Sequence, residues 1–265
     1  MTEPQLTKGG SRRDRILQLL KMQGRITVQE IIDKFQCSEA TARRDLDQIV
    51  KTEPVIRTIG GAQYEGYAAA RETSFFEKKE QHWPEKEAIA AKAASLIQPG
   101  DIIGLTGGST TYLISRAIKH MRGITVVTNA VNVAMELAES DGIQVVVTGG
   151  VMRNRSFELC GPLAEKMVEH LHIGKMFIGI DGVTEEQGLT TYSEQEAEIA
   201  RLLIRRSAST IAVFDPTKVG RTSLFSIAPL KEIHACVTNA SLPQTFRKVL
   251  RTHSIEIYLA DKEEF

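Results

Sequence analysis

Apolar residues recur with helical spacing in two neighbouring runs between residues 26 and 50. The two runs are Val28, Ile31, Ile32 and Phe35, then Ala42, Leu46, Ile49 and Val50. Each run predicts a short amphipathic helix, and Ser38 stands directly before the second one as an N-cap candidate. Two such helices joined by a few residues form the helix-turn-helix plan, whose second helix can lie in a DNA major groove.

The polar face of the second predicted helix carries residues suited to DNA contact. At about 100° per residue, the positions opposite the apolar stripe are Ala40, Thr41, Arg44, Asp47 and Gln48. Thr41, Arg44 and Gln48 have side chains that read base edges, and Arg43 on the flank suits a phosphate. We predict a DNA-contacting surface made of Ser38, Glu39, Ala40, Thr41, Arg43, Arg44 and Gln48. The alternative is the solvated face of an ordinary helical hairpin.

A strand–turn–strand pattern follows the second helix. Val55–Thr58 predicts a strand, Gly60 and Gly61 a hairpin turn, and Ala62–Tyr64 a return strand. A two-stranded ribbon directly after a recognition helix is the winged form of the motif, in which Arg57 is placed to touch backbone phosphates. The wing therefore favours the DNA interpretation over the solvated hairpin.

From Asp101 onward the pattern changes to short apolar strands that alternate with helices. The predicted strands are Ile102–Leu105, Ile124–Val127, Ile143–Val147, Met176–Ile180, Ile211–Phe214, Ala235–Val237 and Ile255–Leu259. The predicted helices between them are Thr111–Lys119, Val131–Ala138, Leu163–Leu171, Glu194–Arg206 and Gln244–Leu250. Regular alternation of strands that are apolar on both faces with helices predicts an α/β fold with a doubly wound, mostly parallel sheet.

These patterns divide the chain into three parts. We predict a winged helix-turn-helix domain at 1–64, a linker at 65–84 and a second domain at 85–265. The net charge of the whole chain is zero, but residues 1–64 carry a formal charge of +3 and the remainder −3. That asymmetry has the sign that DNA binding needs and is too small to decide the matter.

The composition narrows the class of protein. Of 265 residues, 42% are hydrophobic and 25% charged, as in ordinary globular proteins. The longest apolar runs are far shorter than the ~20 residues of a membrane helix, and the first residues have no signal-peptide core. The three cysteines follow no disulfide or metal-ligand spacing. We expect a cytoplasmic protein with no membrane association, no metal and no cofactor.

Small polar residues gather where the first predicted strand of the second domain ends. The segment Thr106–Thr111 reads Thr-Gly-Gly-Ser-Thr-Thr and runs straight into a helix. Glycines let the backbone approach a ligand closely, exposed amides and hydroxyls donate hydrogen bonds, and a helix N-terminus favours negative charge. Gly107, Gly108, Ser109, Thr110 and Thr111 therefore predict a phosphate cradle. The alternative is a tight strand–helix turn that binds no ligand.

Other strand ends should face the same edge of the sheet, where ligands bind in folds of this class. The residues concerned are Thr128, Asn129, Gly149, Gly150 and Asp181. Lys218 lies in a loop after the fifth strand and could neutralise an anion, although a solvated loop accounts for it equally well.

Short motifs follow one another in a fixed order along the chain: 38–46, Arg57 with 60–62, 99–101, 108–111, 128–129, 148–150, 188–191 with Glu196 and Ala197, and 215–220. In these motifs the chain resembles the DeoR family of bacterial carbohydrate-operon repressors over nearly its whole length. The resemblance implies a winged helix-turn-helix joined to a sensor domain similar to the ribose-5-phosphate isomerase fold. It also implies that a phosphorylated sugar releases the protein from operator DNA. Thr106 departs from the pattern, because family members often carry an aspartate there.

We therefore expect a sugar-phosphate-responsive repressor that is not an enzyme. Operator double-stranded DNA and the sugar phosphate are its expected partners, and a homo-oligomer, dimer or tetramer, is expected because paired recognition helices suit a palindrome. Asn129, Gly149, Asp181, Glu196 and Lys218 would line the sugar. The competing hypothesis is a phosphosugar isomerase with an attached DNA-binding domain, in which Asp181, Glu196 and Lys218 supply the base and the cation.

Overall fold

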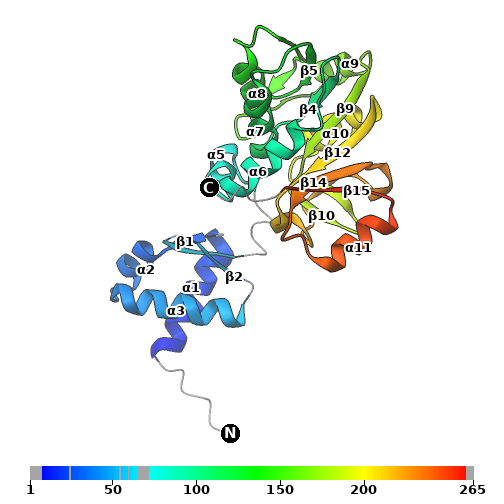
Figure 1. Ribbon diagram of the computed structural model, residues 1–265. Coiled ribbons are helices and arrows are strands. Elements are labelled where there is room, and N and C mark those ends of the chain that lie inside the picture. Colours follow the sequence, from blue (N-terminus) through cyan, green and yellow to red (C-terminus); the bar gives the residue numbers. More distant parts are fainter. Residues whose placement is uncertain (1–7, 24, 54, 59, 65–71, 261–265) are drawn as a thin grey trace. The chain divides into compact units, whose positions relative to one another are not determined.

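The computed structural model describes residues 8–23, 25–53, 55–58, 60–64 and 72–260, and the chain forms two compact units divided between Glu72 and Thr73 (Figure 1). Residues 65–71 of the segment predicted as a linker lie outside the described residues, and residues 73–84 belong to the second unit. The domain boundaries at 64 and 84 stay a prediction.

The first unit is a winged helix-turn-helix. Its elements are α1 Lys8–Gln23, β1 Arg25–Thr27, α2 Val28–Phe35, α3 Glu39–Thr52, β2 Val55–Thr58 and β3 Gly61–Tyr64. The predicted helical hairpin and wing are thus confirmed, and β1 adds a third strand that pairs with β3. The Ser38 hydroxyl caps α3 by accepting a hydrogen bond from the Thr41 amide at 3.3 Å, as predicted.

Both apolar stripes of the hairpin pack into one small core. Fully buried residues at its centre come from all three helices and from β1: Ile16, Leu20, Ile26, Ile31, Ala42 and Leu46. Asp45 is also buried, and its carboxylate accepts a hydrogen bond from the Arg12 guanidinium of α1 at 2.6 Å. This ion pair joins α1 to α3, so the recognition helix is held by a buried carboxylate as well as by its apolar stripe.

The second unit is built on a seven-stranded sheet. The strands are β4 Ile102–Leu105, β5 Ile124–Thr128, β6 Ile143–Val147, β9 Ile173–Gly179, β12 Ser207–Val213, β14 Ala235–Asn239 and β15 Glu256–Ala260. They lie in the order β15-β14-β12-β9-β4-β5-β6, and every neighbouring pair is parallel. The predicted doubly wound parallel sheet is confirmed, with each predicted strand present and its limits shifted by a few residues at most.

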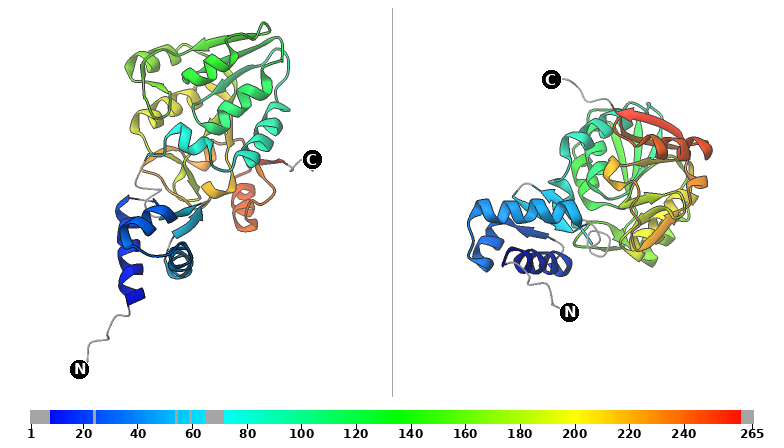
Figure 2. Two further views of the ribbon diagram at one scale, coloured as in Figure 1. Left: turned by 90° about the vertical axis from the view of Figure 1, so that its left-hand side faces the viewer. Right: turned by 90° about the horizontal axis from the view of Figure 1, so that it is seen from below.

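Helices cover both faces of this sheet (Figures 1 and 2). The helices are α6 Trp83–Ala94, α7 Ser109–Ile118, α8 Val131–Leu137, α9 Pro162–Val168, α10 Glu194–Arg205 and α11 Gln244–Thr252. Alternate residues of β12 face opposite helical layers. Ile211 and Val213 pack in the core that contains α6 and α7, whereas Ala212 packs with α10 and α11. This period of two explains why the strands are apolar on both faces.

Several short elements were not predicted from the sequence. They are α5 Phe75–Lys79, β7 Val151–Met152, β8 Leu159–Cys160, β10 Gly182–Thr184, β11 Gly188–Thr191, β13 Phe225–Ala228 and the 3₁₀ turns Pro216–Lys218 and Leu230–Glu232. The strands β10, β11 and β13 form a separate antiparallel sheet. Among the described residues, no helix is both long and apolar enough to cross a membrane.

Candidate functional site

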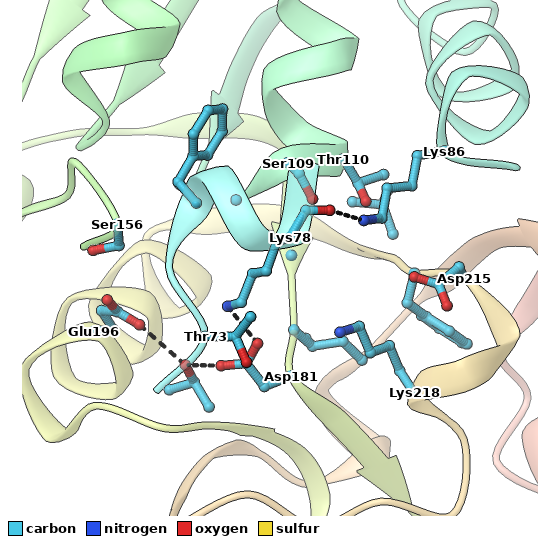
Figure 3. A pocket seen from close by; sticks show the side chains of 18 of the residues that line it. Thr73, Lys78, Lys86, Ser109, Thr110, Ser156, Asp181, Glu196, Asp215 and Lys218 are labelled. Atoms are coloured by element: carbon cyan, nitrogen blue, oxygen red, sulfur yellow. Dashed lines mark hydrogen bonds and ion pairs between the residues drawn. The ribbon is translucent and has the colours of Figure 1, made fainter. Parts of the chain in front are cut away.

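A cavity lies where the order of the parallel strands reverses. The chain proceeds from β4 outward to β5 and β6, then returns to β9 on the other side of β4. Ligands bind at such switch points, beyond the carboxyl ends of the strands. The residues that follow β4, β9 and β12 line this cavity, together with α5 and the loop before β8 (Figure 3). Seven of the predicted effector residues are among them: Gly107, Gly108, Ser109, Thr110, Asp181, Glu196 and Lys218.

The junction of β4 and α7 presents unpaired hydrogen-bond donors. Gly108 is the N-cap of α7 with φ of 122°, a conformation that favours glycine. Within the described part of the chain, the amides of residues 108–111 and the hydroxyls of Ser109 and Thr110 have no hydrogen-bond acceptor. Four free amides and two hydroxyls at the positive end of a ten-residue helix form a site for an anion.

Thr106 and Gly107 shape the wall behind that junction. The Thr106 hydroxyl accepts a hydrogen bond from the Gly179 amide at 3.0 Å, so this side chain ties β4 to β9 and does not line the cavity. A Cβ atom on Gly107 would lie 2.3 Å from Cγ of Glu158. Because Gly107 has no side chain, the Glu158 side chain can pack against this loop.

Asp181 is the most heavily bonded carboxylate of the cavity. Its Oδ1 lies 2.5 Å from Nζ of Lys78, and its Oδ2 accepts hydrogen bonds from the Thr191 hydroxyl at 3.1 Å and the Tyr192 amide at 3.2 Å. Burial would raise the pKa of this carboxyl, but the positive charges of Lys78 and Lys218 outweigh it and lower the pKa to about 2. Asp181 is thus ionised at neutral pH and acts only as an acceptor.

Two glutamates on the same side of the cavity behave differently from each other. Glu196 is paired with the Arg153 guanidinium, whose Nε lies 3.1 Å from its Oε1. Glu158 forms no ion pair with the residues that the structure describes: its Oε2 accepts a hydrogen bond from Nδ2 of Asn129 at 2.8 Å. Burial and the negative charge of Glu196 raise the pKa of Glu158 to about 8. Glu158 is therefore protonated at neutral pH and can donate a hydrogen bond.

Three lysines reach the cavity from different elements. Lys78 comes from α5, Lys86 from α6 and Lys218 from the 3₁₀ turn after β12 (Figure 3). Burial and the neighbouring charge of Lys218 lower the pKa of Lys86 to about 8. Burial would lower the pKa of Lys78 as well, but Asp181 and Glu196 raise it. Burial also lowers the pKa of Lys218, against the attraction of Asp181 and Asp215.

Five of the predicted effector residues do not line this cavity. The Thr111 hydroxyl donates to the Gly108 carbonyl at 3.0 Å and so closes the first turn of α7. The Thr128 hydroxyl donates to the Leu105 carbonyl at 2.8 Å and joins β5 to β4. Asn129 supports Glu158 from behind. Gly149 and Gly150 have φ values of 70° and 110° and turn the chain from β6 into β7. None of the five lines the cavity, and the contacts and turns described here are structural.

Sequence reasoning did not include Lys78, Lys86, Glu158 or Asp215 among the effector residues. Asp215 lies just after the end of β12 and lines the cavity. The other three lie on α5, on the first turn of α6 and in the loop before β8, none of which follows a strand of the main sheet. A search for ligand residues at strand ends therefore cannot identify Lys78, Lys86 or Glu158.

The predicted DNA-contacting residues lie at the start and on the outer face of α3. Ser38, Glu39, Ala40, Arg43, Arg44 and Gln48 are exposed, and Thr41 is half-buried beside its cap. The side chains of Arg44 and Gln48 have no partner among the described residues. Arg43 instead pairs with Glu39 at 2.7 Å. This arrangement leaves Arg44 and Gln48 available to base edges.

Arg57 of the wing is engaged within its own unit. Its Nε lies 3.1 Å from Oδ1 of Asp47 on α3, and its Nη1 donates to the Gly61 carbonyl at 2.6 Å. These contacts orient β2 and the turn against the recognition helix. A DNA phosphate bound by Arg57 would therefore share the guanidinium with the Asp47 carboxylate.

Comparison with known families matches both units. A family model described as the DeoR-like helix-turn-helix domain matches residues 12–66, and one described as the DeoR C terminal sensor domain matches residues 81–240. The chain belongs to the DeoR family. The family predicted from the short motifs is thereby confirmed, and with it the class of DNA-binding transcriptional regulator.

Relatives of this DeoR-family chain match it almost from end to end. The transcriptional repressor GlcR of Bacillus subtilis is 31% identical over 258 residues, covering 94% of this chain and 95% of that protein. The transcriptional regulator GlpR of Haloferax volcanii is 31% identical and covers 93% and 96%. The glycerol-3-phosphate regulon repressor of Escherichia coli K12 is 27% identical and covers 95% and 99%. These relatives are named as regulators and not as enzymes.

Solved structures with a similar outline include ribose 5-phosphate isomerase A from Methanocaldococcus jannaschii. It is 17% identical, has a TM-score of 0.38, and covers 51% of this chain and 53% of that one. Similarity at this level says nothing about activity.

Proposed function

We propose that this DeoR-family chain represses a carbohydrate-utilisation operon in the cytoplasm and leaves its operator when a phosphorylated sugar fills the cavity. The observation that supports the sugar phosphate best is the start of α7. Its free amides and the hydroxyls of Ser109 and Thr110 line one small space together with the buried Lys86 and the half-buried Lys78 and Lys218. That combination suits a dianionic phosphate on a small molecule.

The opposite side of the cavity suits the sugar. Asp181 is ionised and offers acceptors, whereas Glu158 carries a proton and offers a donor. A polyol presents both donors and acceptors, so the two carboxyl groups together match hydroxyl groups that neither would satisfy alone. Glu196 and Lys218 complete this side, and Asn129 fixes Glu158 in place.

On DNA, Arg44, Gln48 and Thr41 would read bases while Arg43 and Arg57 hold phosphates. Two recognition helices one DNA turn apart bind a palindrome more tightly than one, so a dimer or tetramer is the functional state. Control by the sugar phosphate requires two states of the protein that differ in affinity for both partners.

A panel of pentose and hexose phosphates, each beside its unphosphorylated sugar, tests the proposal. The full chain should gain thermal stability with one of the phosphates only, and the same compound should release the DNA upstream of its own operon in an anisotropy assay. Ser109→Ala and Thr110→Val should lower affinity for that compound about tenfold each, the cost of a charge-assisted hydrogen bond. Thr245→Val, an exposed threonine on α11, is the matched control. Normal release by the two cavity variants would place the effector elsewhere.

The isomerase hypothesis keeps one observation in its favour, the presence of Asp181, Glu158 and Lys218 in one cavity. Against Asp181 as the base stands its pKa of about 2, far below that of an efficient general base at neutral pH. A turnover assay on the same panel separates the two functions. Rapid isomerisation that Glu158→Gln or Asp181→Asn abolishes would establish an enzyme.

A further inference from the structure

The helix α5 is the first element of the sensor unit after the division of the chain between Glu72 and Thr73. It has five residues, Phe75–Lys79, and begins with a capping box formed by Ser74 and Glu77. A helix of this length does not persist by itself. Its position therefore depends on its contacts with the rest of the unit.

One group of contacts is apolar. Phe75 is buried, and its ring lies edge-on to Tyr112 of α7 and to Phe157, with centroid distances of 5.5 and 5.6 Å. The Phe75 amide also donates to the Arg155 carbonyl at 2.7 Å. These contacts hold the N-terminal end of α5.

The other group consists of two ammonium groups that line the cavity. Nζ of Lys78, on α5 itself, lies 2.5 Å from Asp181. Nζ of Lys86, on α6, donates to the Lys78 carbonyl at 2.5 Å and to the Gln81 carbonyl at 2.7 Å (Figure 3). Carbonyls at a helix end lack partners within the helix. The Lys78 carbonyl accepts from the Gln81 amide at 3.4 Å as well as from Lys86, so Lys86 and the Lys78–Asp181 pair tie the C-terminal end of α5 to the rest of the unit.

Lys86 is left with one unused donor, and although the charges of Asp215 and Glu85 act on it, it forms no ion pair among the described residues. An ammonium group has three donors, and two of them point at α5. Lys86 is 3% exposed, and among the described residues no carboxylate lies within ion-pair distance of it. A buried cation without an anionic partner is costly, and an anion seated on Ser109 and Thr110 would supply that partner.

We propose that Lys78 and Lys86 bind the anion with the same ammonium groups that hold α5, so that an occupied cavity fixes α5 in its docked position. The inference rests on the proposed function for the presence of the anion. The docked α5 places Lys78 and its carbonyl orients the Lys86 ammonium, so the anion and the docking of α5 favour each other by linkage. The chain from the winged helix-turn-helix joins the sensor unit at this helix, so its docking is the step by which occupancy reaches the DNA-binding unit.

Hydrogen exchange on the full chain, with inorganic phosphate as the probe, tests this directly. At saturating phosphate the amides of residues 75–81 should exchange about fivefold more slowly or better, as expected when local opening is suppressed. The amides of α11, remote from the cavity, should not change. Unchanged exchange over 75–81, while phosphate binds in a manner that Ser109→Ala weakens, would overturn this inference and leave the proposed function intact.

Substitutions of Lys86 and Phe75 test the link between phosphate binding and the docking of α5. Lys86→Met should weaken phosphate binding about tenfold or more and remove the slowing over 75–81, whereas Lys248→Met, an exposed lysine on α11, should do neither. Phe75→Ala loosens α5 without altering a charge and should still weaken phosphate binding about threefold or more. Wild-type phosphate affinity in Phe75→Ala would refute the linkage. Failure of phosphate and every sugar phosphate to bind would refute the proposed function and this inference together.

Discussion

The outer face of α3 and the cavity at the start of α7 both suit anions, but they hold their cations in opposite ways. On α3, Arg44 is exposed and has no partner among the described residues, and Arg43 forms an exposed pair with Glu39. In the cavity, Lys78 and Lys86 are fixed by Asp181 and by backbone carbonyls. The first arrangement keeps side-chain freedom until DNA binds, and the second has already lost it.

The difference has consequences for mutation. An exposed arginine contributes to binding and little to folding, so its loss should affect DNA alone. A buried charge is part of the fold as well as of the site, so its loss should change stability, pH dependence and ligand affinity together. The following predictions test that contrast, and they run from the largest expected effect to the smallest.

Asp181→Asn should destabilise the sensor unit by about 3–5 kcal/mol, because it leaves the Lys78 ammonium buried without its counter-charge. Urea unfolding at pH 7 measures it. The folded pKa of Asp181 is about 2, below its ordinary value of ~3.9. Its contribution is therefore complete above pH ~4 and should fade in the wild type as the pH falls towards 2. Asp141→Asn, an exposed aspartate of the same unit, is the control, and an equal small effect of both would contradict the contrast.

Glu158→Gln should stabilise the sensor unit increasingly as the pH rises. The folded protein keeps the Glu158 proton up to pH about 8, whereas the unfolded chain releases it near ~4.3. Folding thus takes up a proton between these values, and wild-type stability falls with pH across the window. Glutamine keeps an acceptor for Asn129 and has no proton to lose.

The free energy of unfolding of Glu158→Gln, relative to the wild type, should rise by on the order of a few kcal/mol between pH 5 and 9. Chemical denaturation at several pH values measures it, with the exposed Glu169→Gln as reference. A difference that does not vary with pH would mean that Glu158 ionises normally.

Arg44→Ala should weaken specific operator binding by about 1–3 kcal/mol and relax the preference at one base position. Effector affinity and the melting temperature should stay as in the wild type, because the side chain is exposed and has no partner in the described part of the chain. Fluorescence anisotropy with operator and mutated operator measures the effect, and Arg251→Ala on α11 controls for loss of a surface charge. Loss of effector binding in Arg44→Ala would contradict the separation of the two regions.

Glu39→Ala should have the smallest effect. It removes an exposed ion pair to Arg43 and an acidic residue from the first turn of α3, which together stabilise the helix by about 0.5 kcal/mol. Operator affinity should rise about twofold because Arg43 is released to the DNA backbone. Titration at two salt concentrations tests this, and weaker binding would show that Glu39 itself contacts the DNA.

The two regions also differ in how far the sequence predicts them. The face of α3 follows from periodicity alone, since a helix places every residue by its number, and the predicted exposed positions 40, 44 and 48 are exposed. The main sheet was predictable for a similar reason: each of its strands is a short apolar run, and helix patterns separate most of them. Residues 107–110 were predicted as a cradle from their glycines and hydroxyls at a helix start, and they do line the cavity.

The rest of the cavity comes from segments without a periodic signal. The strands β10 and β11 are short and rich in glycine and threonine, so no alternation marks them. Lys78 lies in a lysine- and glutamate-rich stretch that resembles a solvated connection, and only its contact with Asp181 shows its role. Glu158 is brought to Gly107 by the turn between β7 and β8, a contact between positions 51 residues apart that only the folded chain reveals.

The contact between Gly107 and Glu158 predicts that these two positions evolve together. The room that Gly107 leaves is filled by the Glu158 side chain, so alanine at 107 is acceptable only where residue 158 becomes shorter. Among DeoR-family proteins with this cavity, the two positions should change as a pair. A lineage that makes such an exchange would give up the protonated carboxyl at the same time, and would thereby alter which sugars it distinguishes.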